Sequence, residues 1–165
     1  RLLGINYKKQ GKYSLALPLL RYCKDRYSAH LTPDHDHCLS VTLELAHTLQ
    51  DVCQYNDALA LQSSLLSLLR GRWGEEDSRT LDAMYAVGSL QVLLGRCGRA
   101  EQYVLRCLEL RSQVLGVTHV RTLRTMVLLG TIFVDLGTYE AESLLLRTIE
   151  LGTGGELLDE EGGLG

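Results

Sequence analysis

The residues with the strongest potential for chemistry form one short polar segment, DHDHC, at residues 34–38. Imidazole, thiolate and carboxylate groups are suitable zinc ligands, so the segment taken alone resembles a metal site. Neighbouring positions of a helix, however, point in different directions and do not all meet at one ion. His35 also recurs as Asp77 and His119 at a step of 42 residues, which is typical of a structural position. We therefore predict that this segment holds no metal.

A catalytic nucleophile would have to be Cys38 or Cys53 acting with His47. Such catalysis also needs an orienting third group and a site for the oxyanion, and neither is apparent in the sequence. Cys23 and Cys107 stand 84 residues apart in equivalent positions of the buried type. Cysteine at such positions is typical of a small core residue, so we predict no catalytic residue.

A phosphate-binding glycine loop is missing as well. The segment GTGGE at residues 152–156 lacks both the Lys-Ser/Thr ending and a following helix. The sequence therefore predicts a protein that is not an enzyme and binds no cofactor.

The overall composition restricts the kind of partner. A formal charge of -3 and a pI near 6.0 give no general attraction to nucleic acid or to anionic lipid. No apolar run approaches the roughly 20 residues that span a bilayer. We therefore predict a protein or peptide partner, and neither nucleic acid nor membrane. The five cysteines are widely spread and odd in number, which is typical of free thiols in a reducing compartment, so we expect a cytoplasmic location.

The elements that would position any functional group follow the same 42-residue step. A repeat of 20 to 50 residues indicates stacked units that bury their apolar faces on one another. Glycine inside a helix costs about 1 kcal/mol relative to alanine, so its return at a fixed step indicates that helices cross there at close range. The small residues at this step are Gly4, Ala46, Gly88 and Gly130, then Ala16, Ala58 and Ala100, and in the turns Gly11, Gly95 and Gly137, where Cys53 breaks the set.

This pattern predicts an all-α fold, a superhelix or solenoid of antiparallel helix hairpins. We expect one repeat array over residues 1–151, made of a partial repeat at 1–30 and repeats at about 31–73, 74–115 and 116–151. Residues 152–165 contain six glycines and four acidic residues, which predicts a disordered tail. The chain begins without Met and within a repeat, so we expect it to be part of a longer protein, with self-association possible through the truncated first repeat.

The helix ends can be placed from their capping residues. We expect a helix to begin near residues 34–36, with a carboxylate as its cap, and another to begin after Asp77 or Ser78. Residues 71–74 (GRWG) are typical of a loop, which would place Trp73 in a linker, packed between two hairpins. The arginines of the third and fourth repeats alternate with acidic residues, which favours a solvated face of mixed charge; they are Arg96, Arg99, Arg106, Arg111, Arg121 and Arg124.

Several of these residues resemble one known family. The turn QGKY at residues 10–13, followed by Ala16, resembles the tetratricopeptide repeat family. The 42-residue step and the linkers LTPDH at 31–35, WGEED at 73–77 and LGVTH at 115–119 are similar to its kinesin-light-chain-like and nephrocystin-like members. The resemblance implies a right-handed superhelix whose first helices line a concave groove for a protein or peptide.

Carried over position by position, the resemblance implies three groups of groove residues. They are Leu43, His47, Gln50 and Asp51 in the second repeat, Asp82, Tyr85, Ser89 and Val92 in the third, and Arg124, Val127, Thr131 and Asp135 in the fourth. The leading hypothesis is a non-catalytic interaction scaffold. The alternative is a sensor or autoinhibitory arm of a nucleotide-binding signalling ATPase, and the sequence that precedes Arg1 in the parent protein would distinguish the two.

Overall fold

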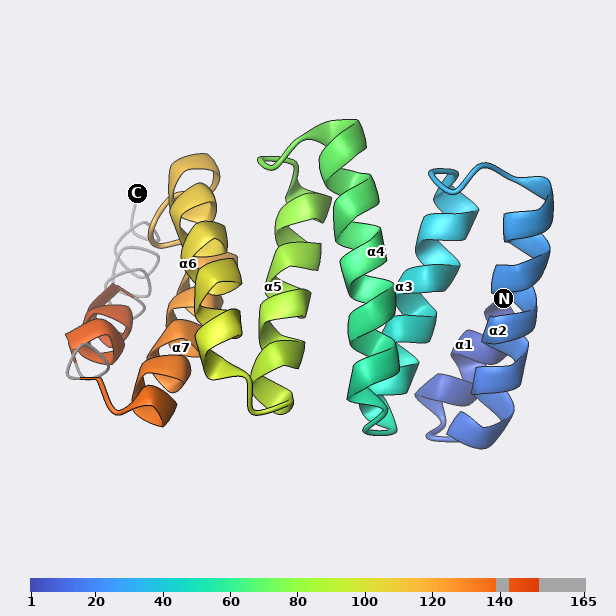
Figure 1. Cartoon of the computed structure of the whole chain (residues 1–165), viewed down its shortest axis with the longest axis horizontal. Helices are drawn as coiled ribbons and strands as arrows, with labels where there is room; N and C mark the ends of the chain where they lie inside the picture. Colours follow the sequence, from blue (N-terminus) through green and yellow to red (C-terminus); the bar gives the residue numbers. More distant parts are fainter. Residues whose placement is uncertain (139–142, 152–165) are drawn as a thin grey trace, which may run out of the picture. The chain divides into compact units, whose positions relative to one another are not determined.

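The computed structural model describes residues 1–138 and 143–151, and the described part is helical without a strand (Figure 1). It divides into two compact units, Arg1–Gly74 and Glu75–Gly165. The prediction of an all-α fold is thereby confirmed. The predicted tail at 152–165 and the first residues of the last predicted helix, 139–142, lie outside the described residues.

The first unit contains two helix hairpins. Its helices are α1 (Leu2–Lys9), α2 (Tyr13–His30), α3 (Asp36–Asp51) and α4 (Tyr55–Trp73). α2 contacts both α1 and α3, and α3 contacts α4. The core between them is aliphatic, and Leu20, Val41 and Leu49 are almost completely buried.

The second unit repeats this arrangement. Its helices are α5 (Ser78–Leu93), α6 (Cys97–Val114) and α7 (Val120–Leu136), and residues 143–151 are also helical. α6 contacts both α5 and α7, and α5 also touches α7. The core of this unit joins α6 to α7 through Ala100, Val104, Leu129, Ile132 and Phe133.

The helix crossings confirm the role of the small residues. A methyl group on Gly88 would lie 2.5 Å from Cγ2 of Val104, and one on Gly130 would lie 2.5 Å from Cδ2 of Leu145. Both distances are shorter than real carbon contacts, so Val104 and Leu145 of the second helices leave no room for a side chain at Gly88 and Gly130. Ala46, at the same step, is 1% exposed.

The turns inside the hairpins share one hydrogen-bond pattern. After α5, the N–H of Gly95 donates to the carbonyl of Val92 and the N–H of Arg96 donates to the carbonyl of Gln91. This pair of bonds is the Schellman motif, whose central residue takes a left-handed conformation that favours glycine. The turns after α1, α3 and α7 repeat both bonds. Cys53 takes the left-handed conformation in the second turn, with φ at 61°.

One predicted loop is wrong. Residues 71–73 continue α4, and the helix ends only at Gly74, where φ is 83°. Two arginines lie in its last turn, where positive charge stabilises the helix dipole, and nothing crowds Gly71. Trp73 is therefore a half-buried helical residue rather than a linker residue, and the Arg72 guanidinium lies 4.5 Å from the centre of its ring.

The first helix leaves apolar surface uncovered. Leu3 is 55% exposed, whereas Leu45, Val87 and Leu129, at the same position of the later repeats, are at most 3% exposed. Self-association through this surface stays a prediction.

The crossing at Gly88 can be tested by adding one methyl group. We expect Gly88→Ala to lower the free energy of unfolding by about 1 to 2 kcal/mol, because overpacking a close contact outweighs the gain in helix propensity. Gly71→Ala is the matched control, since Gly71 is helical with nothing within 4 Å of the added methyl, and it should raise stability slightly. Urea unfolding followed by circular dichroism measures both; equal effects would refute the close crossing.

The turn at Cys53 offers a second test. Cys53→Gly should stabilise the protein by about 0.5 to 1 kcal/mol, because a side chain is strained in the left-handed region. The reciprocal change, Gly95→Ala, should destabilise it, since Gly95 has φ at 69°. Both midpoints are read from thermal unfolding, and a destabilising Cys53→Gly would contradict this account of the turn.

Candidate functional site

The predicted groove residues of the second unit lie on α5 and α7, two helices that touch each other. Four residues of α7 are exposed, Arg124, Val127, Thr131 and Asp135, and so is Asp82 of α5. Tyr85, Ser89 and Val92 of α5 are half-buried. We call these eight residues the α5–α7 face.

Tyr85 brings the two helices of this face together. The Arg124 guanidinium of α7 lies 6.0 Å from the centre of the Tyr85 ring, and the Arg111 guanidinium of α6 lies 5.1 Å from it. A guanidinium near an aromatic ring is attracted by the electrons of the ring. The side chain of Tyr85 is thus held between α6 and α7, and one part of it stays open to solvent.

Arg111 is the centre of a buried polar network that joins three helices. It is 3% exposed and donates hydrogen bonds to the backbone carbonyl of Arg121 (3.0 Å) and the hydroxyl of Thr125 (2.8 Å), both in α7. In α5 it donates to Oδ1 of Asp82 at 2.7 Å and more weakly to the carbonyl of Leu81 at 3.5 Å. A single side chain therefore fixes α5, α6 and α7 relative to one another.

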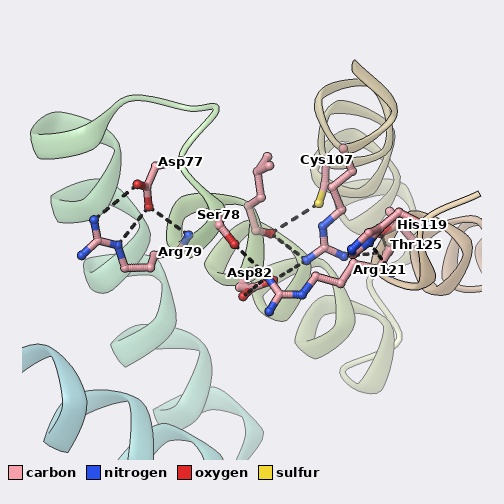
Figure 2. A network of polar contacts seen from close by, with 10 residues as sticks. Asp77, Ser78, Arg79, Asp82, Cys107, His119, Arg121 and Thr125 are labelled. Atoms are coloured by element: carbon pink, nitrogen blue, oxygen red, sulfur yellow. Dashed lines mark hydrogen bonds and ion pairs between the residues drawn. The ribbon is translucent and has the colours of Figure 1, made fainter. Parts of the chain in front are cut away.

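Asp82 is shared between two arginines, as Figure 2 shows for Arg121. Its other carboxylate oxygen lies 3.1 Å from the Arg121 guanidinium, which also donates to the Ser78 hydroxyl at 2.7 Å. Arg111 and Arg121 thus each pair with one carboxylate oxygen of Asp82.

The prediction of a solvated mixed-charge face is wrong for Arg111 and correct for Arg106. Arg106 is exposed and pairs with Glu75 and Glu109 at 2.8 and 2.7 Å. Arg111 occupies the position of Tyr27 and Leu69 in the earlier repeats. A charged residue at a position that is otherwise apolar could have indicated a buried polar network from the sequence.

The end of the α5–α7 face that contains Asp135 makes polar contacts of its own. The Cys97 thiol donates to Oδ2 of Asp135 at 3.5 Å, and Thr131 donates to the carbonyl of Val127 within its own helix. A shallow open pocket lies beside Asp135 and is lined by the start of α6, including Arg96 and Arg99.

The first unit carries the remaining predicted groove residues on α3. Leu43 and Asp51 are exposed, whereas His47 and Gln50 are half-buried. Lys8 of α1 pairs with Glu44 of α3 at 3.1 Å. Burial, followed by the positive charge of Lys8, lowers the pKa of His47, so its imidazole is neutral at neutral pH.

Cys107 and Cys38 are poor nucleophiles in this structure. Cys107 is completely buried, its thiol donates to the carbonyl of Leu81, and burial raises its pKa to about 11. Burial also raises the pKa of Cys38. In the described residues no hydrogen bond joins His47 to Cys38 or Cys53; the Cys53 sulfur accepts one from the Tyr55 hydroxyl instead. A raised pKa disfavours the reactive thiolate.

The polar segment at residues 34–38 serves the start of α3. Nδ1 of His35 accepts the N–H of His37 at 3.1 Å, and the His37 ring stacks on Tyr27. The cap is thus an imidazole, not the carboxylate predicted for this helix. A hydrogen bond from Thr32, and then the charge of Arg72, lower the pKa of Asp34, whose carboxylate pairs with Arg72 of α4. Among residues 1–138 and 143–151, no three His, Cys, Asp or Glu side chains are arranged to hold a metal, and no helix could cross a membrane.

Comparison with known proteins places this architecture in one class. No family model and no curated protein matches the sequence. Among solved structures, BtubC (BKLC) from P. vanneervenii superposes with a TM-score of 0.84 at 17% identity over 94% of this chain and 62% of that one. The tetratricopeptide-like repeats of a putative kinesin light chain from Podosopora anserina superpose with a TM-score of 0.82 at 19% identity, over 93% of this chain and 73% of that one.

A third structure, a Rap protein complexed with competence and sporulation factor, has a TM-score of 0.70 at 20% identity, over 91% of this chain and 40% of that one. The chain therefore has the fold of a tetratricopeptide-like repeat array. As predicted, the fold is similar to that of kinesin-light-chain-like repeats, and the chain spans less than two thirds of the BtubC structure.

The network around Arg111 can be tested against a matched arginine of the same helix. Arg111→Ala should lower the free energy of unfolding by about 3 kcal/mol, because it leaves a cavity and removes the buried partner of Asp82 and of two backbone carbonyls. Arg106→Ala also removes two carboxylate contacts, but on the exposed surface, and should change stability little. Urea unfolding compares the two, and equal losses would show that the network does not hold the helices.

Proposed function

We propose that this protein is a non-catalytic interaction module that holds a peptide or partner domain on the α5–α7 face. The observation that carries the proposal is the half-buried Tyr85 with the exposed Arg124 and Val127 beside it. Aromatic residues and arginines contribute most of the binding energy in many protein interfaces. A surface that combines them on a preorganised scaffold suits a protein ligand.

The rigidity of this face supports the proposal. Arg111 fixes α5 and α7 through hydrogen bonds to both, so little ordering of the protein is required when a partner binds. The exposed side chains alternate in character along α7, with Arg124 followed by Val127 and Thr131. An extended or helical segment could place apolar and polar groups against them in turn.

We also propose that α3 of the first unit offers a separate contact surface for a partner. Leu43 offers an exposed apolar contact, and Asp51 a negative charge, on the helix equivalent to α5 and α7. The Rap protein in the comparison was solved in complex with competence and sporulation factor, so an array of this fold can hold another molecule. The net charge of -3 favours a protein over nucleic acid as the partner here.

The proposal is tested with a displayed library of random dodecamer peptides selected on the full chain. The affinity of the strongest selected peptide is then measured by fluorescence anisotropy on the double variant Tyr85→Ala with Arg124→Glu. We expect a loss of at least about a hundredfold, as for the removal of two residues that dominate an interface. Circular dichroism should show unchanged helical content, because neither side chain is fully buried.

A matched control uses the same residue types on a second helix. Arg21→Glu with Tyr22→Ala changes an exposed arginine and an exposed tyrosine of α2, outside the α5–α7 face. This variant should bind the peptide as the wild type does. If the control loses binding while the Tyr85 and Arg124 variant keeps it, the proposed face is wrong.

A further inference from the structure

Three helices of this protein begin with the same geometry but with two different chemistries. His35, Asp77 and His119 precede α3, α5 and α7 with ψ at 138°, 135° and 136°. Each side chain accepts the backbone N–H two residues later, at 3.1, 2.9 and 3.1 Å. The acceptor is an imidazole Nδ1 in the first and third cases and a carboxylate oxygen in the second. Figure 2 shows the second and third of these caps at Asp77 and His119.

The imidazole can accept this bond only in one protonation state. Nδ1 has a free lone pair when the ring is neutral and carries its proton on Nε2. A protonated ring has donors at both nitrogens, so the helix loses the cap and gains a positive charge at the end where its dipole already disfavours one. A carboxylate at the same position keeps its cap as long as it stays ionised.

We propose that His35 and His119 make the starts of α3 and α7 sensitive to mild acid, while the start of α5 is insensitive because its cap is Asp77. The proposal does not depend on the proposed binding function. Protonation of these two caps would then loosen two of the three linkers between hairpins in the part of the chain that the structure describes.

The groups around each cap define its electrostatic surroundings. Near His35 lies Asp34, whose carboxylate pairs with Arg72 of α4. The neighbouring His37 ring, 5.1 Å from the His35 ring, stacks on Tyr27 of α2.

Around His119 the surroundings are mostly cationic. Arg121 donates the N–H of the cap, and its guanidinium is held by Asp82 and Ser78 of α5. Arg111 of α6 binds the carbonyl of the same Arg121.

The carboxylate cap is also lost on acidification, but only at a lower pH. The Arg79 side chain, and then its backbone N–H, lower the pKa of Asp77, so this cap is present above the ordinary range of a carboxyl group and stays present at pH 5.5. A neutral imidazole cap contributes stability above the ordinary imidazole range, and that contribution disappears as the pH falls. His47 gives a loss of the same sign because its pKa is lowered, so it stays unchanged in every variant compared.

The experiment compares thermal midpoints of the full chain at pH 7.5 and pH 5.5. The wild type should lose about 2 to 4 °C for each histidine cap on acidification. The thermal midpoint of the double variant H35D with H119D should fall less than that of the wild type, by the contribution of both histidine caps. The midpoint of Asp77→His should fall further than that of the wild type, by the contribution of one additional histidine cap. Aspartate already serves in the same backbone geometry at Asp77, so the double variant is expected to fold. Equal acid sensitivity of the wild type and the double variant would overturn the proposal.

A second measurement does not depend on stability. Nitrogen-15 chemical shifts of the imidazoles at pH 7.5 report which ring nitrogen carries the proton. His35 and His119 should show the Nε2–H form with unprotonated Nδ1, and their amide partners, His37 and Arg121, should shift as the pH falls. A proton on Nδ1 in either ring at pH 7.5 would overturn the proposal for that cap.

Discussion

The structure depends on how closely two helices approach inside each hairpin. The distance between them is so short that the first helix can carry only a hydrogen atom or a methyl group at the crossing, as at Gly88 and Ala46. Leucine or valine of the second helix then fills the surface that a larger residue would occupy. This contact recurs at each 42-residue step, and within the second unit it leaves the two first helices α5 and α7 as neighbours. The face that we propose for binding is a consequence of that arrangement.

Arg111 shows how one hairpin departs from the others without changing the frame. The earlier repeats place Tyr27 and Leu69 at its position, where apolar contact is sufficient. A buried guanidinium adds little net stability compared with a well-packed apolar residue, but it demands partners at fixed places. Here those partners are Asp82 in α5 and Thr125 in α7. The third hairpin therefore has a more closely defined contact with the next helix, and Tyr85 lies directly beside that contact.

Much of the fold could be predicted because the 42-residue step exposes positions with a single physical requirement. The crossings at Gly88 and Gly130, the left-handed turns and the cap at Asp77 each follow from one residue and its spacing. The errors arise where two local preferences compete. Residues 71–73 contain a glycine, yet the arginines beside it favour the helix end, and α4 continues. Near residues 34–36 the carboxylates suggested the cap, but Asp34 pairs with Arg72 and leaves the position to His35. The buried network of Arg111 required knowledge of which helices meet, and that knowledge comes only from the structure.

The uniform turns have a consequence for how such a chain can change in length. Every hairpin closes with the same two backbone hydrogen bonds, so a tandem duplication of 42 codons would insert a new hairpin without disturbing those already present. Duplication of the third repeat would nevertheless meet one obstacle. The first of the two Arg111 side chains would then face the copy of Ala83, which is the residue at the position of Thr125. It would therefore lose its hydroxyl partner. The second repeat, with Leu69 at the position of Arg111, would not meet this obstacle, and Arg111 marks a hairpin whose neighbour cannot be exchanged freely.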